Sequence, residues 1–351
     1  MHPGSHPLNH FGACILDAET LRLTTEEKTF FTRADPFGFI LFARNIDTPD
    51  QIAALCDEMR QAVGRDAPIL IDQEGGRVQR MRAPLWREWL PPLDHVANAG
   101  GGEDGDAAEA MRLRYRLIAH ELRAVGIDGN CAPLVDVAGP DTHPFLKNRC
   151  YGTDPATVAR MGRAVADGLL QGGVLPVVKH IPGHGRAMVD SHLELPRTDV
   201  PHATLSAVDF APFKALNDLP MAMTAHVVYP ALDTRPATLS PVVMQAIRDV
   251  MGFAGLVMTD DISMKALAGS QFGSLGEICH ASLAAGCDVI LHCNGTLDER
   301  REVADASGQL SDIGQTRAEA ALSARHSPDS VDIPALEAKL SALMNGRAYG
   351  G

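Results

Sequence analysis

Short apolar runs recur along the chain and alternate with stretches of helical periodicity. Eight runs of this kind lie near Ala13–Asp17, Phe39–Ala43, Ile69–Ile71, Ala132–Val137, Leu175–Val178, Met221–Ala225, Leu256–Met258 and Val289–Leu291. Most positions within each run are apolar, with little alternation, which is typical of strands that are buried on both faces. The pattern therefore predicts eight short strands of a parallel sheet.

Helical patterns fill most of the intervals between these runs. Apolar residues follow one another at steps of three and four in Met111, Tyr115, Ile118, Leu122 and Val125, in Val158, Met161, Val165 and Leu169, and in Leu336, Leu340 and Leu343. Gly172 and Gly173 are typical of the end of the second of these helices, and Ser240 before Pro241 is typical of the start of another. Residues 297–347 are expected to be mostly helical.

This alternation of strands and helices indicates the fold class. Parallel strands are joined by right-handed helical crossovers, and eight of them close into a barrel. We therefore predict an α/β fold, a single-domain TIM (β/α)8-type barrel over residues 12–351, with its C-terminal helices packed on it and a flexible N-terminus over residues 1–11. An open doubly wound sheet is the alternative, but no Gly-x-Gly-x-x-Gly turn follows the first strand.

Composition and charge narrow the class of partner. The chain has 351 residues and a formal net charge of -13, which argues against nucleic acid because phosphate binding needs a basic face. Its seven cysteines show no paired spacing and are expected to be reduced. The sequence begins with no signal-peptide pattern, and no stretch approaches the roughly 20 apolar residues of a membrane span. We expect a cytoplasmic protein whose partner is a small molecule.

Polar residues follow most of the predicted strands. They are Asp72, Glu74, Arg77 and Arg80 after the third strand, Asp136 in the fourth, Lys179 and His180 after the fifth, His226 after the sixth, Asp260 and Asp261 after the seventh, and His292 and Asn294 after the eighth. The carboxyl ends of parallel strands meet at one rim of a barrel, which is where such folds carry chemistry. The convergence of ionisable groups predicts an active site at that rim.

Several of these residues also have a structural interpretation. Asp136 is as well suited to cap a turn, and Glu74, which precedes two glycines, to be solvated. His226 and His292 lie among apolar residues and are more simply read as hydrogen-bonded histidines of the core. Asp72 is harder to explain without a function, because a buried carboxylate without a partner is costly.

One loop carries most of the candidate chemistry. Lys179-His180-Ile181-Pro182-Gly183-His184-Gly185 follows the fifth strand, and Asp190-Ser191-His192 comes shortly after it. Zinc-assisted hydrolysis through three histidines, His180, His184 and His192, is one option, although Pro182 and Gly183 prevent the helical His-x3-His arrangement.

The other option is acid–base catalysis with a nucleophile. Asp190 and His192 lie on the same side of an extended segment, so the carboxylate can orient the imidazole for proton transfer. Asp260 or Asp261 would then be the nucleophile. The basic residues Lys179, Arg80 and Arg149, together with Asp72, would bind the hydroxyl groups of a polyol.

Three blocks of the sequence resemble a known family. They are the loop just described, the block Ile71-Asp72-Gln73-Glu74-Gly75-Gly76-Arg77-Val78-Gln79-Arg80, and the block Met258-Thr259-Asp260-Asp261-Ile262-Ser263-Met264. Their order and spacing, over residues 38 to about 295, are similar to those of the family 3 glycoside hydrolases, in particular the bacterial β-N-acetylhexosaminidases.

The resemblance implies a mechanism and a set of site residues. It implies hydrolysis of terminal β-linked N-acetylglucosamine with retention, with Asp260 as nucleophile, His192 as acid/base and Asp190 as the partner of His192. It assigns Asp72, Arg80, Arg149, Lys179 and His180 to binding of the sugar. We also expect the segment from Gly185 to His192, which has no apolar run to anchor it, to open and close over the sugar. A static loop pinned by Arg186 or by His184 is the alternative.

The resemblance also implies the biological setting. The enzyme would need no cofactor and no metal, and would act as a monomer on N-acetylglucosamine–anhydro-N-acetylmuramic acid peptides during peptidoglycan recycling. A phosphorylase on the same scaffold, in which phosphate replaces water, and a metal-dependent TIM-barrel hydrolase are the alternatives.

Overall fold

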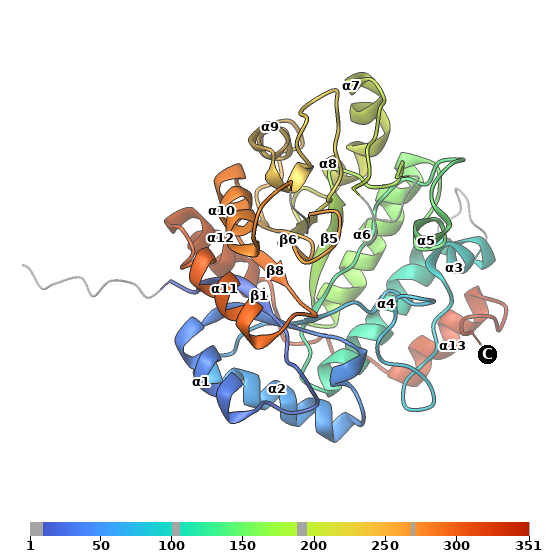
Figure 1. The fold of residues 1–351 in the computed structure, drawn as a ribbon. Coiled ribbons are helices and arrows are strands. Elements are labelled where there is room, and N and C mark those ends of the chain that lie inside the picture. The colour runs from blue at the N-terminus through green and yellow to red at the C-terminus, as the bar shows by residue number, and fades with distance from the viewer. Residues whose placement is uncertain (1–9, 100–105, 188–194, 268–270, 351) are drawn as a thin grey trace, which may run out of the picture.

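A ring of parallel strands forms the centre of the molecule (Figure 1). We describe the computed structural model for residues 10–99, 106–187, 195–267 and 271–350. The strands within these ranges are β1 (Gly12–Leu16), β2 (Pro36–Leu41), β3 (Ile69–Ile71), β4 (Gly129–Asn130), β5 (Leu175–Ile181), β6 (Met221–Thr224), β7 (Leu256–Met258) and β8 (Ile290–His292).

The strand order shows that the sheet closes on itself. It runs β7-β6-β5-β4-β3-β2-β1-β8, with every neighbouring pair parallel. A parallel bridge between Met258 and Val289 connects β7 to the start of β8, and the Thr259 N–H donates to the Val289 carbonyl at 3.0 Å. The predicted TIM-type barrel is therefore confirmed.

Helices surround the strands. They are α1 (Thr25–Ala34), α2 (Pro49–Val63), α3 (Pro92–Asn98), α4 (Asp106–Ala124), α5 (Pro144–Lys147), α6 (Pro155–Gln171), α7 (His202–Thr204), α8 (Ala211–Ala215), α9 (Pro241–Gln245), α10 (Leu275–Ala285), α11 (Leu297–Ser307), α12 (Asp312–Ser323) and α13 (Ile333–Leu343). The Ser240 side chain caps α9 by accepting from the Val243 N–H, and α6 ends at Gln171 with Gly172 as its C-cap, both as predicted. No helix in the described ranges is both long and apolar enough to cross a membrane.

The fourth strand is the element that sequence analysis placed wrongly. It is the pair Gly129–Asn130, whereas the predicted run Ala132–Val137 follows it and takes part only in an isolated parallel bridge, between Leu134 and Lys179. Pro133 has no amide hydrogen to donate, which interrupts the hydrogen bonding of this stretch to β5. The bonds that do form include one from the Lys179 N–H to the Pro133 carbonyl, at 2.9 Å. The observed strand thus lies a few residues before the predicted one, and Asp136 still lies near the rim.

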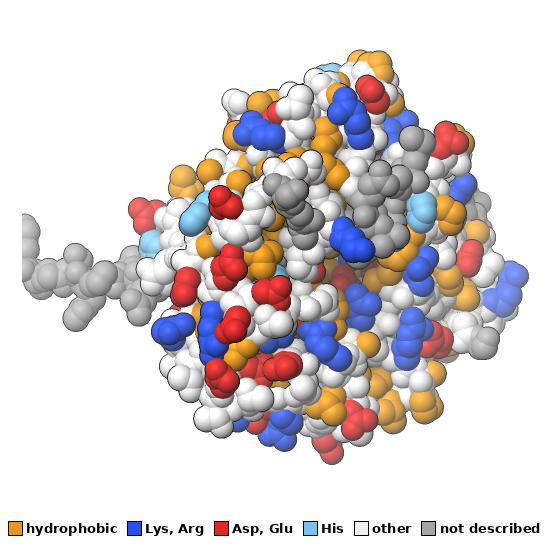
Figure 2. All heavy atoms as spheres, viewed as in Figure 1, with side chains coloured by type: hydrophobic (Ala, Val, Ile, Leu, Met, Phe, Trp, Pro, Cys, Tyr) orange, Lys and Arg blue, Asp and Glu red, His pale blue; other side chains and the backbone are white. Residues whose placement is uncertain are grey.

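Alternate residues of each strand pack into two different hydrophobic cores, because their side chains point to opposite faces of the sheet. In β1, Ala13 and Ile15 belong to the cluster inside the barrel, whereas Cys14 and Leu16 pack outward beneath the helices. Ala318 and Ala321 of α12 join the inner cluster. Charged side chains of both signs are spread over the face of the molecule shown in Figure 2.

Candidate active site

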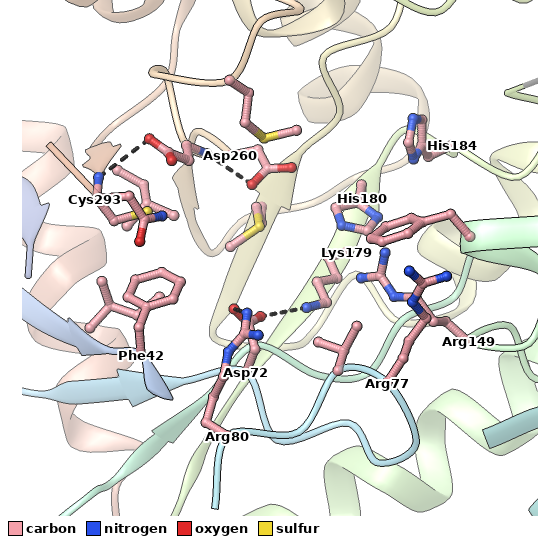
Figure 3. Close-up of a pocket in the computed structure, with 18 residues that line it drawn as sticks. Phe42, Asp72, Arg77, Arg80, Arg149, Lys179, His180, His184, Asp260 and Cys293 are labelled. Atoms are coloured by element: carbon pink, nitrogen blue, oxygen red, sulfur yellow. Dashed lines mark hydrogen bonds and ion pairs between the residues drawn. The ribbon is translucent and has the colours of Figure 1, made fainter. Parts of the chain in front are cut away.

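A pocket of about 270 Å³ opens at the carboxyl ends of the strands. Six of the residues predicted for the site line it together: Asp72, Arg80, Arg149, Lys179, His180 and Asp260. Asp260 lies opposite Asp72, with Lys179 and His180 to one side (Figure 3). The predicted acid/base pair, Asp190 and His192, lies outside the described residues.

Asp72, directly after β3, pairs with two cations. Its Oδ1 accepts from Lys179 Nζ at 2.8 Å, and its Oδ2 accepts from Arg80 Nη2 at 3.1 Å. Burial alone would raise the pKa of Asp72, but Lys179 and Arg80 outweigh it and hold that pKa well below its ordinary value. The Asp72 carboxylate therefore stays charged, and the lone pairs that Lys179 and Arg80 do not use face the pocket.

Sequence analysis placed Glu74 at the rim but interpreted it as solvated and did not assign it to the site. It is not solvated: only 1% of it is exposed, and its carboxylate accepts from Arg149 Nε at 2.9 Å and Nη2 at 2.8 Å. Its Oε1 also lies 2.6 Å from Lys179 Nζ. Burial opposes the charge, but Arg149 and Lys179 lower the pKa of Glu74 to about 2. We call Asp72, Glu74, Arg149 and Lys179 the Glu74 cluster.

A second group, the Asp136 cluster, consists of Asp136, His180 and His184. His180 Nδ1 donates to Asp136 Oδ2 at 2.7 Å, and the His184 backbone N–H donates to Asp136 Oδ1 at 2.6 Å. Asp136 therefore does more than cap a turn, since it fixes the His180 ring and leaves Nε2 as the nitrogen with no hydrogen bond to a described residue. Burial, and then His180, lower the pKa of His184 to about 4.

The Asp136 cluster is also where the described residues could hold a metal ion. One ligand atom from each of its three residues lies within 4.8 Å of the others, and His184 Nε2 has no hydrogen-bond partner among the described residues. A carboxylate and two imidazoles are suitable ligands for zinc. Both carboxylate oxygens of Asp136 already accept hydrogen bonds, so the cluster is satisfied in part without an ion.

The environments of Asp260 and Asp261 differ. Asp261 accepts from the Ser263 N–H, the Ser263 hydroxyl and the Cys293 N–H. Its carboxylate is therefore held in hydrogen bonds to the chain that follows β7 and β8. In the described part of the chain, Asp260 accepts only the Asp261 N–H, at 2.8 Å. Burial would raise the pKa of Asp260, but His180 and His226 outweigh it and lower that pKa. Asp260 is thus a charged carboxylate with free lone pairs facing the pocket.

The two histidines assigned to the core are both buried, but within the described ranges only one is hydrogen-bonded. His226 uses both ring nitrogens, with Thr238 Oγ1 at 2.8 Å and the Asp261 carbonyl at 3.0 Å. His292 has no hydrogen-bond partner on either nitrogen among the described residues, and its Nδ1 lies 4.0 Å from Asp261 Oδ1.

The first residues of the segment expected to move are anchored. The Thr142 hydroxyl donates to the Gly185 carbonyl at 2.5 Å, and Arg186 Nε donates to Asp209 at 2.8 Å. A Cβ on Gly185 would lie 2.0 Å from the Val137 carbonyl oxygen. Gly185 and Arg186 are thus held by polar contacts rather than by an apolar run, and residues 188–194 lie outside the described ranges, so movement of the segment stays a prediction.

Together, the barrel and the pocket define a class of protein. Charged hydrogen-bond donors of Arg80, Arg149 and Lys179 line the same pocket as the Asp260 carboxylate, which keeps free lone pairs. This pocket lies at the rim where TIM-barrel enzymes bind small molecules. The sequence over residues 15–324 matches the family model described as the glycosyl hydrolase family 3 N terminal domain. The chain belongs to this family and is a glycoside hydrolase.

Individual relatives agree with this assignment. The chain is 37% identical over 289 residues to a beta-hexosaminidase of Alkalilimnicola ehrlichii, covering 81% of each chain. It is 38% identical over 309 residues to a beta-hexosaminidase of Methylococcus capsulatus, covering 87% of this chain and 89% of the relative. Among solved structures, NagZ from Neisseria gonorrhoeae in complex with N-trifluoroacetyl-D-glucosamine matches with a TM-score of 0.82 and 30% identity, covering 96% of this chain and 98% of that one.

Proposed function

We propose that this enzyme is a β-N-acetylhexosaminidase that removes terminal β-linked N-acetylglucosamine with retention, through a glycosyl ester on Asp260. The observation that carries the proposal is the contrast between Asp260, whose carboxylate is charged and faces the pocket, and Asp72 and Glu74, whose carboxylates are paired with cations. The relatives named beta-hexosaminidase and the NagZ complex with an N-acylated glucosamine support the choice of sugar.

The geometry supports a different role for each group of residues in the site. Four pocket residues present fixed donors and acceptors for sugar hydroxyls: Asp72, Arg80, Arg149 and Lys179. His180 presents the ring nitrogen that does not bond to Asp136. Asp260 then attacks the anomeric carbon as the aglycone leaves, and water later releases the sugar from the ester. We assign protonation of the leaving group and activation of that water to His192, with Asp190 as its partner, on the family resemblance.

The stereochemistry of the product tests this proposal. Proton NMR during hydrolysis of 4-nitrophenyl β-N-acetylglucosaminide should show the β anomer of N-acetylglucosamine before mutarotation. An α anomer formed first would refute the ester mechanism. N-acetylglucosamine 1-phosphate as the main product in phosphate buffer would instead establish the phosphorylase.

The contacts of two basic residues argue against the phosphorylase. Lys179 is paired with Asp72 and Glu74, and Arg186 is paired with Asp209, so neither is a free cation for phosphate. Against the metal-dependent alternative, we expect full activity after treatment with a chelator. A preparation that loses activity with its metal and regains it with zinc would support that alternative, with the Asp136 cluster as the site.

We further propose that the natural substrates are N-acetylglucosamine–anhydro-N-acetylmuramic acid peptides, and that the enzyme acts as a cytoplasmic monomer. The family resemblance supports the substrate, and seven buried cysteines, all free thiols, support a reducing compartment. Rates on purified anhydromuropeptides and on chitobiose should differ in favour of the former, and equal rates would contradict the cell-wall assignment.

A further inference from the structure

Helix α4 places a buried cation beneath the site, at Arg114. The residue is 0% exposed, and Nη2 donates to the carbonyl oxygens of Glu74 at 2.6 Å and Leu90 at 2.8 Å. Its guanidinium carbon lies 5.5 Å from the ring centroid of Trp89 and 5.7 Å from that of Tyr115. In the described part of the chain it forms no ion pair with a carboxylate, and its Nε and Nη1 have no hydrogen-bond partner.

Such a residue is costly for stability alone. Burial of a charge without a counter-ion is unfavourable, and an apolar side chain of similar size would fill the same space without that penalty. Burial accordingly lowers the pKa of Arg114 below its ordinary value. This cost indicates that the hydrogen bonds from Arg114 to the Glu74 and Leu90 carbonyls have a role other than stability.

The chain around Glu74 is shaped to receive this guanidinium. The Glu74 carbonyl also accepts the Tyr115 hydroxyl at 3.2 Å, so two side chains of α4 hold one peptide oxygen. The next residue, Gly75, has φ of 102°, and a Cβ there would lie 1.9 Å from Arg114 Nη2. Only glycine permits both this backbone conformation and this close approach.

We propose that Arg114 is a positioning residue for the sugar site, acting through Glu74. By holding the Glu74 carbonyl, with help from Tyr115, it directs the Glu74 carboxylate between Arg149 and Lys179 and so sets Lys179 against Asp72. The inference rests on the proposed function for the sugar-binding role of these residues. Arg114 itself does not line the pocket.

The structure provides a matched control on the same helix. Arg116 is also buried, with 4% exposed, and its Nη2 donates to a backbone carbonyl, that of Asp329, at 2.7 Å. It too forms no ion pair with a carboxylate among the described residues, but it contacts no part of the Glu74 cluster. Arg116→Met therefore removes a comparable interaction away from the site.

The test compares kcat and KM of wild type, Arg114→Met and Arg116→Met on 4-nitrophenyl β-N-acetylglucosaminide, with melting temperatures measured alongside. We expect Arg114→Met to raise KM at least about tenfold and to change kcat less than about threefold, because sugar-binding groups move while Asp260 does not. Arg116→Met should leave KM unchanged. Arg114→Lys, which keeps one donor, and Tyr115→Phe, which removes one, should give smaller rises in KM.

Other outcomes overturn the inference. A wild-type KM in Arg114→Met, whatever its melting temperature, would show that the residue is structural only. If Arg114→Met does not fold, a wild-type KM in both Arg114→Lys and Tyr115→Phe overturns it equally. An inactive wild type would instead refute the proposed function and, with it, the inference.

Discussion

Replacing Glu74 with glutamine gives the sharpest prediction, because the residue is buried between two cations. Glutamine keeps the shape of the side chain but removes its charge, which leaves Lys179 and Arg149 without their shared counter-ion. We expect Glu74→Gln to lower the free energy of unfolding and to raise KM for the sugar, because both cations belong to the site.

The size and pH dependence of the effect follow from the pKa of Glu74, lowered from 4.5 to about 2. A shift of this size corresponds to about 3 kcal/mol. Because the folded pKa is the lower one, this stabilisation is fully present above about pH 4.5 and is lost as the pH falls through about 2. At about pH 3.5, about 2 kcal/mol of it should remain.

Urea unfolding of wild type and Glu74→Gln at about pH 7 and about pH 3.5 tests this expectation. The difference in free energy between the two proteins should be about 3 kcal/mol at the higher pH and about 2 kcal/mol at the lower. Equal stability at neutral pH, or a difference that does not shrink in acid, would refute the reasoning.

Glu58 provides the control. Its pKa is also lowered to about 2, chiefly by a hydrogen bond from Arg22, but its partners Arg22 and Lys28 are 58% and 46% exposed. Added salt should therefore weaken the effect of Glu58→Gln much more than that of Glu74→Gln.

Three further predictions concern the rest of the site. Asp260→Asn should lower kcat at least about 10⁴-fold, and a residual rate within tenfold of wild type would exclude it as nucleophile. Gly185→Ala should cost about 1–3 kcal/mol in urea unfolding, because its Cβ would meet the Val137 carbonyl oxygen, whereas Gly139→Ala, with space around it, should cost under about 0.5 kcal/mol. Zinc at micromolar concentration should inhibit by occupying the Asp136 cluster, and a chelator should restore the rate. Unchanged activity with zinc present would contradict this use of the cluster.

The fold could be predicted because its strands are buried on both faces. A strand between barrel interior and helices has no solvent-facing side, so its sequence is a continuous apolar run, as in Leu256–Met258. The strand at Gly129–Asn130 has no such run. Asn130 instead bonds to Gln73 in both directions, at 3.0 Å and 3.1 Å, and this polar pairing gives no periodic signal.

The site could be predicted only as far as position in a strand determines it. Asp72, Lys179 and Asp260 follow or end apolar runs, and the barrel alone brings them to one rim. The burial of Glu74 depends instead on a turn at Gly75 and on Arg114, a residue 40 positions away on a helix. Pattern analysis of residues near Glu74 could not reveal that partner.

The sequence shows many ionisable residues at the rim but not what each one does, and the hydrogen-bond partners separate them. Asp72 and Glu74 share Lys179 and are charged because cations surround them. Asp261 is held by two loops. Asp260 combines a lowered pKa with a single backbone hydrogen bond among the described contacts, so it is charged at neutral pH and still able to form a new bond. A nucleophile needs both properties, whereas a carboxylate that binds hydroxyl groups needs only the first. The number of partners at each carboxylate, more than its position in the sequence, therefore distinguishes Asp260 from the other acidic residues at this rim.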